Sequence, residues 1–363
     1  MGGTAGERPS NEANEMKIVF TGLENERYRK ELGKTNEYNN FYLLLKADPK
    51  NEVSFVPFDR VLTVGRRGYN QEIVETVRRE KPDLFFAFMY TDELTRETLD
   101  EVKKLTVSTA WFSDDHWRLD NYSRFYAPHF TKIITTWSKA PGCYARFGIT
   151  NVIRSQWGFN PGVYRPVVVP KQDIAVSFIG MKTPHREKII GELRAAGIPV
   201  FVRGLGWPEG RASFQEMLEI ISRSKVNLNL NPPMSAFALK PLAQIFFRRR
   251  RNWIVPDFFH SFRNLRSFFY KRIPQIKARP FEITGCGGFC ITGRADDMEN
   301  YFASGKEIVL YENTRDLIEK IHYYLEHEDE RNRIAKAGYE RSLREHTYQA
   351  RLKEILKELG FSA

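Results

Sequence analysis

The sequence predicts an α/β protein in which two parallel-sheet domains face each other across a cleft. Short apolar runs rich in β-branched and aromatic residues alternate with amphipathic helical patterns, which is typical of parallel α/β units. The alternation occurs twice, on either side of a proline-rich stretch, FNPGVYRPVVVPKQD. The chain has 363 residues, 42% of them hydrophobic, which is more than one core usually holds.

The first series predicts six strands and the second predicts five. The first series has its apolar runs at 17–21, 53–58, 83–89, 106–112, 132–137 and 152–157. The second has them at 174–179, 199–202, 226–230, 289–292 and 307–310. Helical patterns lie at 71–80, 186–196, 213–222, 281–284, 315–325, 328–345 and 348–359. Because ligands of such sheets bind beyond the carboxyl ends of the strands, the loops that follow strands are the candidate sites.

Each series is expected to form one domain. Residues 1–15 are polar and glycine-rich, so we expect a disordered leader there. The first domain is predicted at 16–160, and 161–173 is predicted to be the linker. The second domain is predicted at 174–345, and the helix within 346–363 is expected to pack back on the first domain.

The net charge of +11 is concentrated in one segment. Residues 240–279 contain eleven Lys and Arg and one acid, Asp257, so this segment carries +10 and the remainder of the chain carries +1. A nucleic-acid groove usually recruits basic residues from several elements. The pattern therefore argues against the alternative function, a basic nucleic-acid-binding protein on an α/β scaffold, and no nucleic-acid partner is expected.

Cysteine content and hydropathy indicate a cytoplasmic protein. Cys143, Cys286 and Cys290 are too few for a disulfide framework, and they are expected to be small buried residues in a reducing compartment. Cys286 and Cys290 have no second pair and no nearby histidine cluster, so no zinc site is expected. No apolar run reaches the roughly 18–20 residues that a membrane span needs.

A cationic loop follows the predicted strand at 174–179. Gly180, Lys182 and Arg186 lie in the sequence IGMKTPHR, which leads from the strand into a helix. The free N–H groups of a helix N-terminus attract anions, so this loop is a candidate cradle for a diphosphate, or else a solvated helix start. The GLGW sequence after the next strand is either a plain turn or a turn that brings an indole face near a base.

The segment QIKARPFEITGCGGFCIT at 275–292 is the strongest candidate for a binding site. Lys277 and Arg279 precede a predicted helix, Glu282 lies in its first turn, and Gly287 is one of the glycines at its end. An acid in a first turn also has a purely structural explanation, since it interacts favourably with the helix dipole by about 0.3–1 kcal/mol. The two cations before the helix, together with the glycine-rich loop after it, indicate an anionic ligand.

Several motifs in this order resemble the spore-maturation-protein (CgeB-like) glycosyltransferases. In the C-terminal half they are VSFIG at 176–180, SKVNLN at 224–229, the segment at 275–292 and IAKAGY at 334–339. In the N-terminal half they are KPD at 81–83 and WFSDD at 111–115. The resemblance implies the GT-B fold, in which two Rossmann-like domains face across a cleft. It also implies transfer of a sugar from a nucleotide-sugar donor to a hydroxyl acceptor, in synthesis of a bacterial surface polysaccharide or glycoconjugate.

The resemblance assigns roles to the donor residues. In related retaining GT-B enzymes the glutamate that opens the equivalent helix hydrogen-bonds the ribose, a role that would fall on Glu282. Pro274 stands where those enzymes often carry a second glutamate, so contact with the sugar or phosphate is expected from Lys277 or Arg279. Because cations and helix N-termini can neutralise a diphosphate leaving group, no metal and no cofactor are expected beside the nucleotide sugar.

The acceptor side is predicted at WFSDDHW, which follows the strand at 106–112. Asp114, Asp115 or His116 could deprotonate an acceptor hydroxyl, and the sequence does not distinguish among them. Alternatively, one of the two aspartates could simply cap a helix.

The remaining basic segment, 240–272, combines cations with aromatic residues. Phe258, Phe262, Leu265 and Phe269 are spaced to share one face of a helix. Such a basic amphipathic helix favours an anionic membrane surface, with packing on the domain and nucleic-acid binding as the alternatives. We therefore expect a peripheral location on the inner face of the plasma membrane and a lipid-linked saccharide as the acceptor.

Overall fold

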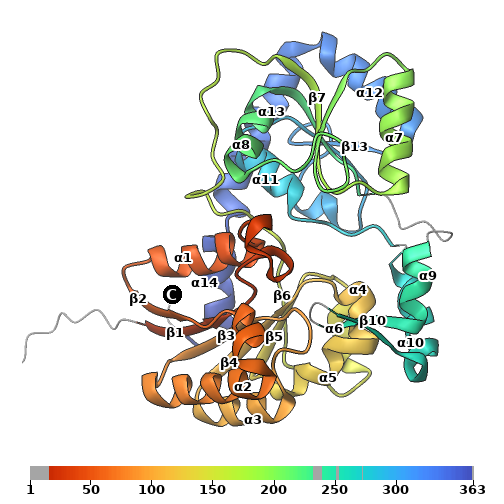
Figure 1. Ribbon diagram of the computed structural model, residues 1–363. Helices are drawn as coiled ribbons and strands as arrows, with labels where there is room; N and C mark the ends of the chain where they lie inside the picture. The colour runs from red at the N-terminus through yellow and green to blue at the C-terminus, as the bar shows by residue number, and fades with distance from the viewer. Residues whose placement is uncertain (1–15, 232–238, 251–252, 272, 362–363) are drawn as a thin grey trace, which may run out of the picture.

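The computed structural model describes residues 16–231, 239–250, 253–271 and 273–361, so the predicted leader lies outside the described residues. Figure 1 shows two α/β halves, one above the other, with α9 and α10 of the basic segment at 240–272, below called the basic insert, along one side. Each half contains one parallel sheet, with the strand orders β2-β1-β3-β4-β5-β6 and β13-β12-β9-β7-β8. The predicted α/β fold with two parallel sheets is therefore confirmed.

The first sheet is covered by helices on both faces. Its strands are β1 (Met16–Thr21), β2 (Asn51–Phe55), β3 (Leu84–Phe88), β4 (Val107–Phe112), β5 (Lys132–Thr135) and β6 (Val152–Arg154). Side chains alternate along β1, so that Val19 packs with α2 (Val61–Glu80) and α3 (Arg96–Leu105). Ile18 and Phe20 point to the opposite face and pack with α1 (Leu43–Ala47) and α14 (Tyr348–Glu358). The end of the chain thus completes the core of the first half.

The second sheet has the same layered arrangement. Its strands are β7 (Ile174–Ile179), β8 (Val200–Arg203), β9 (Ser224–Asn229), β12 (Cys290–Gly293) and β13 (Val309–Tyr311). One face packs against α7 (Pro184–Ala195) and α12 (Thr314–Glu326). The other packs against α8 (Phe214–Arg223) and α11 (Arg279–Gly285), and α13 (Glu328–Glu345) lies against α11. A capping box begins α8, in which the side chains of Ser213 and Glu216 each accept a hydrogen bond from the other residue's backbone N–H.

The basic insert is more than the single amphipathic helix that the sequence predicts. It contains α9 (Leu239–Phe246), an antiparallel hairpin of β10 (Phe247–Arg250) and β11 (Trp253–Pro256), and α10 (Ser261–Tyr270). Phe258 lies in a separate 3-10 turn before α10. Shorter helices α4 (Asp115–Arg118), α5 (Arg124–Tyr126) and α6 (Ala140–Ala145) complete the first half. The insert leaves the second half but packs against α4 of the first half.

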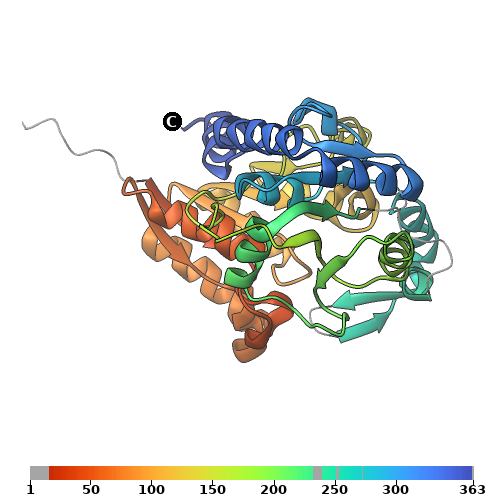
Figure 2. The ribbon, with the colours of Figure 1, turned by 90° about the horizontal axis from the view of Figure 1, so that it is seen from above.

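Apart from the insert, the chain crosses between the halves at Phe159 and at His346, and these two crossings lie side by side. Phe159 donates its N–H to the carbonyl of His346 at 3.1 Å, and Tyr348 donates to the carbonyl of Phe159 at 2.9 Å. Beyond this junction, α14 packs Tyr348 against Phe41 with ring centroids 4.6 Å apart. In Figure 2 the C-terminal helices, in blue, run along one side of the molecule and end beside the N-terminal half.

The close packing of α13 on the segment before β13 gives a testable prediction. A Cβ on Gly338 would lie 2.3 Å from the backbone carbonyl oxygen of Glu307. Because a backbone atom cannot move aside cheaply, Gly338→Ala should lower the free energy of unfolding by about 1–3 kcal/mol. The matched control is Gly191→Ala in α7, where the added methyl meets nothing within 4 Å. That variant should be neutral or more stable, and equal melting temperatures for the two variants would contradict the packing described here.

Candidate active site

The loops after β7 and β8 are joined to each other at the carboxyl edge of the second sheet. Lys182 donates its backbone N–H to the carbonyl of Leu205 at 2.9 Å, and the indole of Trp207 donates to the carbonyl of Gly180 at 2.9 Å. Trp207 is only 7% exposed, so the GLGW sequence forms a supporting turn and its indole face is not presented to a ligand. Lys182 is ion-paired with Glu187 at 2.8 Å.

Arg186 lies at the start of α7, where Thr183 caps the helix. Its guanidinium donates to the carbonyls of Leu230 and Met181 at 3.0 and 2.9 Å. Burial lowers the pKa of Arg186, and the nearby charge of Arg279 lowers it further. In the part of the chain that the structure describes, no carboxylate forms an ion pair with Arg186. The two guanidinium groups therefore leave positive charge at this edge of the sheet.

Glu282 is held from two sides. Arg279 contacts its Oε2 at 2.8 Å, and the hydroxyl of Tyr164 donates to its Oε1 at 3.0 Å. Glu282 is 6% exposed. Burial and the charge of Glu282 raise the pKa of Tyr164, so the phenol stays a hydrogen-bond donor. Tyr164 belongs to the predicted linker, and its proline-rich sequence gives no signal for this contact.

Gly287 lies apart from these cations. It follows the last turn of α11, its φ of +72° ends the helix, and it lies beside Pro166. The structure therefore brings Arg186, Arg279 and Glu282 together but not Gly287.

Lys277 crosses the cleft to the predicted acceptor side. Its Nζ lies 3.0 Å from Oδ1 of Asp114, which follows β4 of the first half. A second contact joins Arg27, after β1, to the sulfur of Met181, after β7, at 3.7 Å. The carboxyl edges of the two sheets thus face each other.

The three candidate bases titrate in different ranges. Burial would raise the pKa of Asp114, but Lys277 and the neighbouring His116 outweigh it and lower that pKa to about 2. Burial and the charge of Lys277 lower the pKa of His116 to about 3. Burial raises the pKa of Asp115 to about 6. A general base works best when its pKa lies near the operating pH, and Asp115 comes nearest.

The surroundings of Asp115 also suit a proton acceptor. Tyr144 donates to its Oδ2 at 3.0 Å, and the nearby hydroxyls of Ser123 and Thr135 also stabilise the carboxylate. No donor lies within hydrogen-bond distance of its buried Oδ1 in the described structure. Asp114 occupies the N-cap position of α4, but its carboxylate caps no backbone N–H. The capping explanation therefore does not account for either aspartate.

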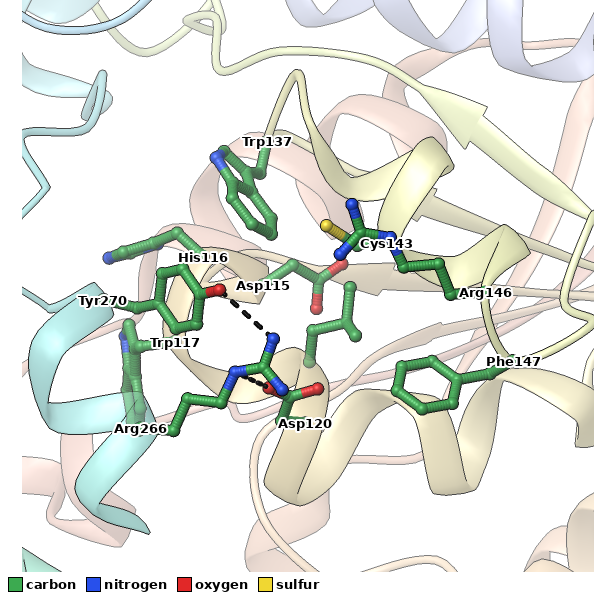
Figure 3. A pocket seen from close by; sticks show the side chains of 11 residues that line it. Asp115, His116, Trp117, Asp120, Trp137, Cys143, Arg146, Phe147, Arg266 and Tyr270 are labelled. Carbon is green, nitrogen blue, oxygen red and sulfur yellow. Dashed lines mark hydrogen bonds and ion pairs between the residues drawn. The ribbon is translucent and has the colours of Figure 1, made fainter. Parts of the chain in front are cut away.

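Asp115 and His116 line a pocket of about 250 Å³ between the first half and the insert. Figure 3 shows the carboxylate of Asp115 near the centre of the lining side chains. Trp117, Trp137 and Arg146 come from the first half, and Arg266 and Tyr270 come from α10. Arg266 lies 3.2 Å from Oδ2 of Asp120 and 3.4 Å from the hydroxyl of Tyr270.

Most residues that line this pocket were not predicted as site residues from the sequence. Trp137 could have been predicted, because it follows β5, whose carboxyl end lies next to that of β4. Arg266 and Tyr270 could not have been predicted, since only the tertiary packing of α10 brings them over the first half.

Within the described ranges, no three His, Cys, Asp or Glu side chains are grouped so that they could hold a metal ion. No helix in those ranges is both long and apolar enough to cross a membrane.

Known proteins share this architecture. Residues 185–357 match the family described as Glycosyl transferase-like. No curated protein sequence matches the chain significantly. Among solved structures, HepE from Anabaena in complex with UDP has a TM-score of 0.57 at 11% sequence identity, and the match covers 95% of this chain and 100% of that one. Sucrose-phosphate synthase from Thermosynechococcus elongatus has a TM-score of 0.58 at 10% identity, with 95% and 99% covered.

These structural matches establish the fold over nearly the whole chain, and the sequence match identifies the half that carries the cations around Arg186 and Arg279. The chain has the GT-B fold, its residues 185–357 are glycosyl transferase-like, and the protein is a glycosyltransferase.

Proposed function

We propose that this glycosyltransferase binds a UDP-sugar on its C-terminal half and transfers the sugar to a hydroxyl of an acceptor bound on its N-terminal half. In this assignment residues 174–345 form the donor domain and 16–160 the acceptor domain. The CgeB-like subtype, and a role in bacterial surface polysaccharide or glycoconjugate synthesis, are part of the same proposal. They are supported by the motifs at 176–180, 275–292 and 334–339.

The charge around Arg186 carries the donor assignment. A partly buried cation without a carboxylate partner is costly, and a diphosphate beside it would supply the missing negative charge. Arg279 lies close enough to lower the pKa of Arg186, so both can act on one anion. Gly180 and Lys182 contribute the loop beside them. A structure of Anabaena HepE contains UDP and another contains UDP-glucose, which supports a uridine nucleotide.

On the acceptor side we assign Asp115 as the general base. Its unpartnered Oδ1 would accept the proton of the attacking hydroxyl, and Tyr144 would hold Oδ2. Lys277 and Asp114, ion-paired across the cleft, would align the two halves and leave Lys277 beside the departing diphosphate. His116, neutral above a pKa of about 3, would act as a hydrogen-bond partner.

The donor assignment predicts that Arg186→Gln weakens UDP binding. Loss of a charged hydrogen-bond donor should cost about 1.5–3 kcal/mol, or roughly 10- to 100-fold in Kd. Lys188→Gln is the matched control, because this cation lies on the same helix with its side chain 75% exposed. Calorimetry with UDP and GDP, in EDTA and again with Mn²⁺, measures the effect. Equal affinities for both variants, or binding that requires Mn²⁺, would refute the metal-free cationic site.

The same titration tests Glu282. If it contacts the ribose, Glu282→Gln should weaken UDP binding but leave binding of inorganic pyrophosphate unchanged. If it only orients Arg279, both ligands should bind more weakly.

The base assignment predicts a pH dependence. Asp115 must be ionised to accept a proton, so kcat/KM for turnover of the UDP-sugar should rise with pH through about 6 and level off above it. Asp115→Asn should lower kcat by about 10²- to 10⁴-fold. Asp114→Asn should keep the rise near pH 6, because Asp114 with its pKa of about 2 is already ionised there. Loss of that rise in Asp114→Asn alone would transfer the role to Asp114.

The outer surface of the insert supports a peripheral membrane role. Phe258, Phe262, Leu265 and Phe269 are 60%, 83%, 38% and 56% exposed, so this face is not packed on the domain. The hairpin adds Trp253, 72% exposed. Residues 240–272 contain nine Lys and Arg and one acid. An exposed aromatic face among cations complements an anionic bilayer, from which a lipid-linked saccharide acceptor would be taken.

Vesicle flotation tests this role. Replacing all four residues from Arg248 to Arg251 by glutamine should weaken binding to anionic vesicles by roughly two to three orders of magnitude, at about 1 kcal/mol per basic residue. The control removes two exposed cations elsewhere, Arg315 and Lys336, whose side chains are 90% and 78% exposed. Wild-type protein that does not float with anionic vesicles, or that floats equally with neutral ones, would refute the membrane role.

A further inference from the structure

The pocket below α10 has the chemistry of a carbohydrate site. Aromatic rings of Trp117, Trp137 and Tyr270 line it together with the carboxylates of Asp115 and Asp120. A pyranose ring presents apolar C–H faces that pack on aromatic rings, and hydroxyls at its edge that need polar partners. A volume of about 250 Å³ is suited to one such ring with little room beyond it.

Two polar features of the pocket are suited to hydroxyl groups. The Oδ1 of Asp115 is buried and unpartnered, and a hydroxyl could donate to it. Arg266, Asp120 and the hydroxyl of Tyr270 form a connected series across the opposite wall, as the dashed lines in Figure 3 show. Such a series offers donors and acceptors side by side, whereas a site for a hydrocarbon chain would lack them.

The roof of this pocket belongs to the other half of the chain. The insert leaves the C-terminal half after β9 and returns to it before α11. It is held on the first half by a hydrogen bond from Asn121 to Asn264 at 3.2 Å and by Lys271, whose Nζ lies 4.0 Å from the ring centre of Trp117. Removing the insert from the first half would remove the wall that contains Arg266 and Tyr270.

We propose that this pocket binds the terminal sugar ring of a saccharide acceptor and is complete only when α10 covers it. The inference rests on the proposed function, because it places the acceptor hydroxyl on Asp115. The inner face of the insert, which contains Arg266 and Tyr270, then selects the acceptor sugar. This role is separate from membrane contact by the outer face.

Cys143 gives a direct probe of occupancy. It lines the pocket and is partly exposed, whereas the other two cysteines of the chain, Cys286 and Cys290, are buried. Burial raises the pKa of the Cys143 thiol, so alkylation by N-ethylmaleimide is followed near pH 8 by mass spectrometry. The probes are methyl glycosides of glucose, galactose, mannose and N-acetylglucosamine, each with UDP present.

At least one glycoside should protect Cys143. Because only the empty pocket reacts, a glycoside at about ten times its Kd should slow alkylation roughly tenfold. Trp137→Ala and Tyr270→Ala should abolish protection, and the matched control Trp253→Ala, on the outer hairpin, should retain it. Saturation-transfer NMR on the same samples reports binding independently of thiol reactivity.

The failure of this inference is distinguishable from failure of the proposed function. If UDP binds but none of the glycosides protects Cys143 or gives a saturation-transfer signal, the sugar pocket is refuted and the donor site stands. Protection that survives both aromatic substitutions also refutes it. Protection by vesicles containing polyprenyl phosphate, without protection by any glycoside, would identify the pocket as a lipid site instead.

Discussion

The paired crossings at Phe159 and His346 are the constraint on which the cleft depends. A single crossing between two domains would act as a swivel, whereas two chain segments joined by backbone hydrogen bonds restrict the motion to bending. Glu282 lies close to this junction, because Tyr164, five residues after Phe159, donates to its carboxylate. The position of α11 is thereby tied to the chain that connects the halves.

Electrostatics makes the cleft asymmetric. On the C-terminal half, Arg279 is ion-paired with Glu282, whereas Arg186 has no carboxylate partner among the described residues, so the surplus charge there is positive. On the N-terminal half, Asp114 is neutralised by Lys277, whereas Asp115 forms no ion pair among the described residues and burial raises its pKa to about 6. The two adjacent aspartates therefore differ in pKa, because Asp114 faces the opposite half and Asp115 faces the core of its own half.

Sequence periodicity predicted every strand of the two sheets because parallel strands are buried on both faces and leave a continuous apolar signal. It failed for the insert, where the Phe258 to Phe269 spacing predicted one helix and the structure has a hairpin and a 3-10 turn as well. Asp114, Asp115 and His116 were placed at the cleft by the strand they follow. Their different pKa values arise from burial and from Lys277, which lies 163 residues away from Asp114, and no local pattern contains that contact.

The packing of α14 has a consequence for biosynthesis. One face of the first sheet is covered in part by Tyr348, Leu352 and Ile355, which are translated long after the strands of that sheet. The strands of that sheet are complete at Arg154, about two hundred residues earlier. At about 5–20 residues per second, translation of the chain between β6 and α14 takes about 10–40 s. The nascent N-terminal half thus exposes this apolar surface to chaperones until α14 has been translated.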